Sequence, residues 1–288
     1  MSESVSALQA GAEQAPPGRG LRPASWRRRL LIGVVSLYVA ALILAPLGGL
    51  FLGTFAEGPA AVLRALADAQ VLGAFGRTLE IAAITVAVHL VFGTAAAWVI
   101  VRQRFIGRRL LNSLIDLPFA VSAVVVGYML LLIFGRNGLL APLLRAFDLR
   151  VAFAMPGLVL ATIFVTLPFV ARELIPVMEA LDAEQEHAAA TLGAAGWQTF
   201  WLVTLPSLRW GMLYGLTLTF ARSLGEFGAV LVIGGGIQGR TETATVFVFH
   251  ALEERQPVAA YAVALVLGLL SLTLVTGVNL LRRRKGLT

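Results

Sequence analysis

The sequence contains no cysteine, which excludes disulfides, zinc–thiolate sites, iron–sulfur ligation and cysteine nucleophiles. Lysine is nearly absent too, because Lys285 is the only one. A phosphate-binding P-loop needs a lysine followed by serine or threonine, and Lys285 precedes Gly286. The three histidines lie far apart, and neither HExxH nor GxSxG occurs. We therefore expect a chain that is not an enzyme by itself and that binds no cofactor of its own.

Charged residues are scarce, at 14% of 288 residues, whereas 58% are hydrophobic. Soluble domains carry about 25% charged residues, so the deviation is the one that a bilayer demands. The net charge of +7 comes from arginines at the ends of apolar runs, where lipid headgroups and membrane orientation explain them. The composition predicts a membrane protein in contact with lipid and with no nucleic-acid partner.

Six apolar stretches are long enough to cross a bilayer, which takes about 20 residues. Five are free of charge, and the remaining one, the fifth along the chain, carries Arg222 and Glu226 in its interior. The predicted spans are Leu30–Ala56, Ile81–Val101, Leu117–Gly135, Val151–Ala171, Leu208–Ile233 and Gln256–Leu281. The fold class expected is therefore an all-α membrane protein with six transmembrane helices.

Most arginines lie before the first span, between the second and third, between the fourth and fifth, and after the last. By the positive-inside rule this asymmetry predicts that both termini are cytosolic. Residues 1–25 are rich in Ser, Ala, Gly, Glu and Pro, and they are expected to form a disordered cytosolic tail. Residues 26–288 then form the transmembrane domain.

The connection between the fourth and fifth spans, residues 173–207, is named here the coupling segment. It carries five acidic residues and neither arginine nor lysine. Glu184–Leu192 favours a helix, Gly193 interrupts it, and a second helix over Ala194–Thr204 is expected to end at Leu205-Pro206. The aromatic residues of the second helix need a partner, either a groove of an ATPase or the membrane surface. The acidic first half favours docking, since anionic lipid would repel it.

The spacing of this segment resembles the cytoplasmic loop of ABC-importer permeases. The matching residues are Ala188, Ala189, Gly193, Val203, Leu205 and Pro206, while the family's glutamate position holds His187 with Glu186 beside it. Further stretches resemble sulfate/thiosulfate permeases of the CysW type, among them Asp116–Ser122, Phe164–Pro176, Ala221–Val230 and Ile237–Thr243. Gly225–Gly228 also occurs in molybdate permeases, so that element alone does not specify the anion.

The resemblance implies a type I (MetI-like) importer bundle in the inner membrane. It implies a second related permease, two ATPase subunits that bind ATP and Mg, and a periplasmic sulfate/thiosulfate-binding protein as partners. The transported ion would be sulfate and thiosulfate, with molybdate or another oxyanion as the alternative. An ion-coupled carrier is a further alternative, and it would need no ATPase.

An oxyanion needs hydrogen-bond donors along its route. The candidates are Ser122, Thr166, Thr217, Thr219, Arg222, Ser223 and Glu226. Arg222 and Glu226 are four residues apart, so they are expected on one helix face. They form either a pair that braces the bundle or a gate in which Arg222 attracts the anion and Glu226 limits its dwell time. Both interpretations remain open at this stage.

Overall fold

The computed structural model describes residues 26–181 and 184–284, and regular secondary structure in these ranges is entirely helical, as predicted. The predicted tail over residues 1–25 lies outside the described part. The elements are α2 (Trp26–Thr54), α3 (Pro59–Leu66), α4 (Ala69–Arg102), α5 (Arg108–Ala120), α6 (Ala123–Phe134), α7 (Ala141–Ala146), α8 (Met155–Ala180), α9 (Glu184–Thr191), α10 (Gly196–Thr199), the π-helical turn η1 (Phe200–Thr204), α11 (Leu205–Leu224), α12 (Gly228–Gly234), α13 (Ala244–Glu253) and α14 (Pro257–Arg284).

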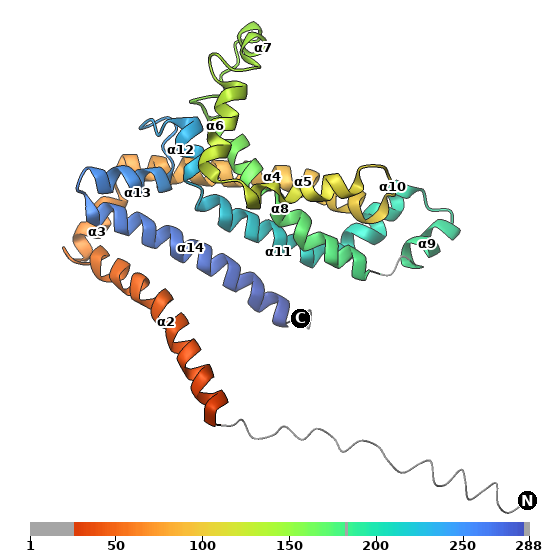
Figure 1. Cartoon of the computed structure of the whole chain (residues 1–288), viewed down its shortest axis with the longest axis horizontal. Coiled ribbons are helices and arrows are strands. Elements are labelled where there is room, and N and C mark those ends of the chain that lie inside the picture. Colours follow the sequence, from red (N-terminus) through yellow and green to blue (C-terminus); the bar gives the residue numbers. More distant parts are fainter. Residues whose placement is uncertain (1–25, 182–183, 285–288) are drawn as a thin grey trace, which may run out of the picture. The chain divides into compact units, whose positions relative to one another are not determined.

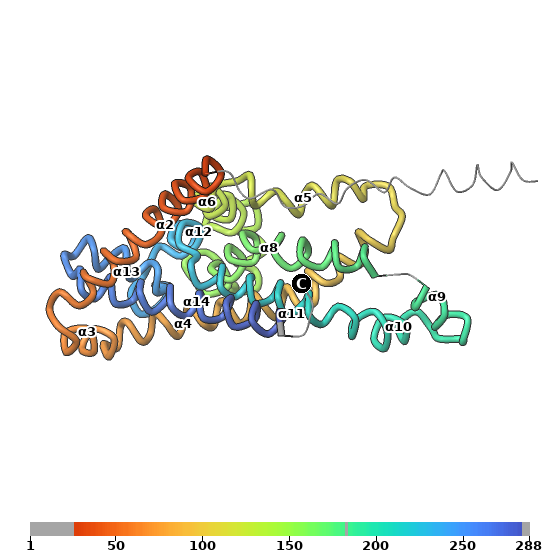
Figure 2. The backbone as a smooth tube through the Cα atoms, turned by 90° about the horizontal axis from the view of Figure 1, so that it is seen from below, coloured from red at the N-terminus to blue at the C-terminus, as the bar shows by residue number. Residues whose placement is uncertain are grey.

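The chain divides into two compact units at Leu50–Phe51. The described part of the first unit is most of α2. The second unit, from Phe51 onward, contains the other helices. In this second unit α4, α8, α11 and α14 form the body, with α3 and α13 at one end and α9 and α10 at the other (Figures 1 and 2).

Within residues 26–181 and 184–284, four helices are long and apolar enough to cross a membrane on their own: α2, α4, α8 and α14. Two bent pairs, α5 with α6 and the stretch Gly196–Leu224 with α12, bring the number of candidate spans to six if each pair is one span. The six predicted spans are thus all found as helix. The third and fifth spans, however, are bent and not single straight helices as predicted.

The third predicted span, Leu117–Gly135, is not one helix. It breaks at Val121–Ser122, where α5 and α6 meet at 112°. Ser122 is extended, with φ −62° and ψ 139°, and serves as the N-cap of α6. Counting uncharged residues measures length but not direction, so hydropathy could not reveal this bend.

The fifth predicted span, Leu208–Ile233, is also broken. Its two halves are bent by 58°, with Gly225–Phe227 between α11 and α12. Glu226 accepts a hydrogen bond from the Ala229 N–H at 3.2 Å and so satisfies a donor at the start of α12. The charge inside this span therefore marks a helix start, which explains why the sequence tolerates it there.

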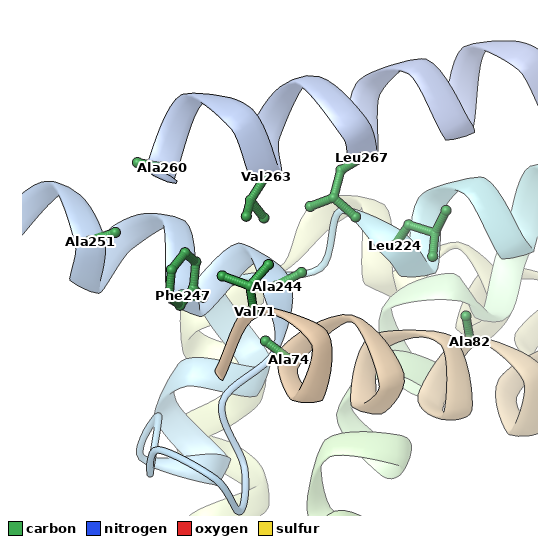
Figure 3. Packing of buried hydrophobic residues seen from close by; sticks show 10 residues of the cluster. All are labelled: Val71, Ala74, Ala82, Leu224, Ala244, Phe247, Ala251, Ala260, Val263 and Leu267. Atoms are coloured by element: carbon green, nitrogen blue, oxygen red, sulfur yellow. The ribbon is translucent and has the colours of Figure 1, made fainter. Parts of the chain in front are cut away.

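One of the main cores lies where α14 covers α4 and α13 (Figure 3). Val71 and Ala74 from α4, Phe247 from α13 and Val263 from α14 point into it. The small residues Ala74, Ala244 and Ala260 allow close approach of these helices, which suits a bundle held by packing in lipid. Leu224, the last residue of α11 before the break at Gly225, belongs to the same core.

The two bent spans pack on each other through a glycine contact between α6 and α12. A Cβ atom at Gly127 would lie 2.6 Å from Cβ of Val232 and 2.9 Å from the carbonyl oxygen of Ala229. The second of these neighbours is backbone and cannot rotate away. Gly127 is therefore required for the distance between α6 and α12.

Substitution Gly127→Ala is expected to destabilise the protein by about 1–3 kcal/mol through overpacking. Alanine is the better helix former, so a loss of stability would have to come from this contact. The measurement is the thermal midpoint of the detergent-solubilised chain. Gly268→Ala on α14 is the matched control, because a Cβ there meets nothing within 4 Å. Equal midpoints for both variants would contradict the contact.

Candidate coupling segment and anion pathway

The coupling segment begins inside a helix. Residues 173–180 continue α8, so the predicted connection is shorter than expected. After α9 the chain turns at Gly193, whose φ of +86° lies in the left-handed region that L side chains rarely adopt. The predicted interruption at Gly193 is confirmed. The turn places α9 and α10 beside each other at one end of the body (Figures 1 and 2).

The predicted end of the second helix at Leu205-Pro206 is wrong. α10 passes through η1 directly into α11, and Pro206 stands in the first turn of α11. Proline is well accommodated at that place, because the first turn of a helix has no partner for its N–H groups. The continuous path means that a displacement of α10 is transmitted to α11 without an intervening loop.

Glu186 holds the coupling segment to the body. Its carboxylate lies 3.1 Å from the guanidinium of Arg102 at the end of α4, and the Thr204 hydroxyl donates to it at 2.9 Å. Both charged side chains are mostly buried, with 18% and 22% exposed. The neighbouring His187, at the family's glutamate position, is exposed. The trio Arg102, Glu186 and Thr204 is named here the segment clasp.

A surface of exposed apolar side chains covers the other side of the segment. Leu192, Trp197, Trp201 and Leu202 are between 60% and 89% exposed.

The predicted docking residues nearby differ in exposure. Ala188, Gly193 and Pro206 are exposed, while Ala189, Val203 and Leu205 are half-buried. Phe200 instead turns inward and meets Trp98 of α4 edge-on at 6.1 Å. The segment is thus anchored on one side and open on the other.

Removing the carboxylate in Glu186→Ala is expected to loosen α9 by about 1.5–3 kcal/mol, the value of hydrogen bonds to a charged group. The measurement is amide hydrogen exchange over residues 184–204, which should become faster. The exchange double variant Arg102→Glu/Glu186→Arg should restore protection in part, whereas His187→Ala should change nothing. An unaltered exchange rate in Glu186→Ala would show that the segment clasp does not stabilise α9.

Arg222 and Glu226 form an ion pair beside the second break. Nη2 of Arg222 lies 2.9 Å from Oε2 of Glu226, and the Glu226 side chain is buried whereas that of Arg222 is 36% exposed. The predicted pairing is confirmed. It does not run along one helix face, because α11 ends at Leu224 and Glu226 stands in the turn. Glu226 is further fixed by its own Oε1, which caps Ala229.

The starts of α6 and α12 meet at this break. A Cβ at Gly228 would lie 3.0 Å from Val124 Cγ2 and 3.3 Å from the Val124 backbone nitrogen. Ser122, which precedes α6, is exposed and caps no N–H with its side chain. The first N–H groups of a helix lack intrahelical partners and carry a partial positive charge. The α6 start therefore gives this region a partial positive charge, and Arg222 adds a partly exposed guanidinium donor whose charge is balanced by Glu226.

The predicted hydroxyl donors are less available. Thr166, Thr217, Thr219 and Ser223 donate to backbone carbonyls one turn earlier in their helices, at 2.7–2.9 Å. Thr166 also lies 3.0 Å from Nε2 of the buried His89. A hydroxyl whose proton is engaged offers only lone pairs, which repel an anion. Ser122 is the predicted hydroxyl with no hydrogen-bond partner among the described residues.

Sequence reasoning missed several polar contacts, among them those of Arg102 and Glu242. Arg102 was counted only toward membrane orientation, although it is the partner of Glu186, 84 residues away in the sequence.

A second cluster surrounds the buried Glu242. Its carboxylate lies 3.0 Å from Gln70 Nε2 and 2.9 Å from His250 Nδ1, and its backbone carbonyl accepts a hydrogen bond from Arg77 Nε at 2.7 Å. The only signal for the second cluster was the resemblance over Ile237–Thr243. Its role is to fix the loop between α12 and α13 on α4.

Comparison with known proteins agrees with this architecture. Residues 89–285 match the family model described as binding-protein-dependent transport system inner membrane component. The chain is 48% identical over 256 residues to the sulfate transport system permease protein CysW of Synechococcus elongatus, covering 89% of this chain and 90% of the relative. It is 45% identical to CysW of Escherichia coli K12 over 87% of this chain and 86% of the relative.

The relative CysT of Escherichia coli K12, also a sulfate transport system permease protein, is 39% identical over 89% of this chain and 93% of its own length. Among solved structures, a chain of a bacterial alginate ABC transporter in complex with its periplasmic protein superposes with a TM-score of 0.73. That alignment covers 90% of this chain and 95% of the other at 18% identity, so it supports the fold alone. Together with the length and identity of the other matches, it leaves one assignment: the chain belongs to the family of inner-membrane components of binding-protein-dependent transport systems, the permeases of ABC importers.

Proposed function

We propose that this chain forms half of the membrane path for sulfate and thiosulfate in an ATP-driven importer. The observation that carries the anion preference is the break between α11 and α12, where the partly exposed guanidinium of Arg222 and the N–H groups at the start of α6 can donate to an anion. Broken membrane helices place their half-helix N-termini at anionic substrates in other transporters. The names of the CysW relatives support sulfate as the specific ion.

The complex proposed contains a second permease of the CysT kind, two ATPase subunits and a periplasmic sulfate/thiosulfate-binding protein. ATP and Mg would be bound by the ATPase subunits. The exposed apolar surface around Leu192, Trp197 and Trp201 is the docking site proposed for one ATPase. Under this assignment the coupling segment and both termini lie in the cytosol. The surface is open, whereas Glu186 is occupied in the clasp, so Glu186 positions the segment and the apolar residues make the contact.

The decisive experiment is uptake of labelled sulfate by the complex reconstituted in vesicles with the binding protein. Uptake should require ATP and the ATPase subunits, and thiosulfate should compete with it more strongly than molybdate. Sulfate uptake by the permeases without the ATPase would contradict coupling through the segment. Stronger competition by molybdate than by thiosulfate would contradict the assigned anion.

A further inference from the structure

A second region rich in positive charge lies away from the break between α11 and α12. A cavity of about 540 Å³ is formed by the end of α6, by α7, by residues 148–153 and by the loop after α12. Four arginines line it: Arg136, Arg145, Arg150 and Arg240. Asp148 is the single acidic residue of its lining. None of the four guanidinium groups has an ion pair or hydrogen bond with another residue of the described part of the chain.

The walls of this cavity are fixed in place. Phe153 adopts φ +56°, which a bulky residue rarely adopts, and its N–H donates to the Ile233 carbonyl at 2.8 Å. Its ring lies against Gly235, where a Cβ would come within 2.9 Å. The loop that carries Arg240 is fixed by Thr241, whose hydroxyl donates to the Gly234 carbonyl at 2.7 Å. The next residue, Glu242, attaches the same loop to α4.

The two ends of α8 indicate on which side of the membrane the cavity lies. Residues 151–153 of the cavity wall lead into the N-terminal end of α8, whereas the C-terminal end of α8 forms the beginning of the coupling segment. A helix of 26 residues is about 39 Å long, which is enough to cross the hydrocarbon core. The cavity is therefore on the side of the membrane opposite the coupling segment.

We infer that this cavity is a binding site for a tetrahedral oxyanion on the outer face, separate from the break at Arg222. Guanidinium groups donate paired hydrogen bonds to the oxygens of sulfate and phosphate. Four unpaired arginines around one carboxylate also repel one another, so a bound oxyanion would relieve that repulsion. The oxyanion can come from solution as sulfate or from the headgroup of phosphatidylglycerol.

The absence of cysteine in the chain permits a direct test. Ala152, which is half-buried in the cavity wall, is replaced in Ala152→Cys as the single thiol. The full chain is placed in phosphatidylcholine nanodiscs, and the thiol is labelled with a sulfonate-bearing methanethiosulfonate. Sulfate at ten times its Kd should slow labelling about tenfold relative to sodium chloride of equal ionic strength. The control Ala60→Cys on the exposed face of α3 should not be protected.

The double substitution Arg145→Gln/Arg150→Gln should remove the protection, whereas Arg222→Ala should leave it intact. The second result separates this site from the proposed transport path, because the assay needs no uptake. If phosphatidylglycerol nanodiscs alone slow the labelling, the oxyanion is the lipid headgroup. Absence of protection by both sulfate and phosphatidylglycerol would overturn the inference. So would protection that persists in the double variant, or protection by polyglutamate but by neither oxyanion.

Discussion

Arg222→Ala is expected to abolish sulfate uptake. Arg222 is the one basic residue at the break between α11 and α12, and more than a third of its side chain is exposed while it pairs with Glu226. Removing a charge that binds the anion should cost about 3 kcal/mol, which corresponds to roughly a hundredfold loss. The measurement is ATP-dependent uptake in vesicles at sulfate concentrations below and above the half-saturating value.

The same substitution leaves the buried Glu226 without its partner, which by itself is destabilising. The double variant Arg222→Ala/Glu226→Gln removes that charge, while the amide oxygen of the new side chain still offers an acceptor to the Ala229 N–H. We expect it to assemble normally and to remain inactive, and we expect Arg222→Lys to retain partial uptake. Normal uptake by the double variant would mean that the pair only braces the bundle and that Arg222 does not attract the anion.

Local chemistry explains which parts of the fold were predictable. Gly193 was predicted to interrupt the helix because glycine is a poor helix former, and in the structure it adopts a φ of +86° at the turn. The pairing of Arg222 with Glu226 was predicted from their separation of four residues, although it forms through the turn after α11 and not along one helix face. Pro206 misled the prediction, because a proline in the first turn of a helix has the same sequence signature as one that ends a helix. The apolar residues on either side do not distinguish the two cases.

Direction and long-range contacts were not predictable in the same way. The bend at Ser122 depends on the packing of α6 on α12, and the two helices are about 100 residues apart in sequence. Glu186 meets Arg102 across 84 residues, and nothing in the local pattern of either residue specifies the other. α4 begins at Ala69, where Asp68 caps its first turn. The prediction placed the start at Ile81, because charged residues near the beginning of α4 had been excluded from the span.

Gly193→Leu is expected to uncouple ATP hydrolysis from uptake. A Cβ at Gly193 would meet no atom within 4 Å, so the effect comes from the backbone alone. Holding an L residue in the left-handed region costs about 1–2 kcal/mol, and the turn between α9 and α10 should relax to a different geometry. Uptake should then fall about tenfold while ATP hydrolysis continues. Both rates are measured on the same vesicles.

Gly196 provides the matched control, because it is also exposed, its Cβ would also meet nothing, and its φ is not positive. Gly196→Leu should therefore transport at the native rate, and Gly193→Asn should be less impaired than Gly193→Leu because asparagine tolerates the left-handed region. This order depends on the turn and not on bulk, since both leucines enter open space. Equal uptake by Gly193→Leu and Gly196→Leu would show that the geometry of the turn at Gly193 has no role in coupling.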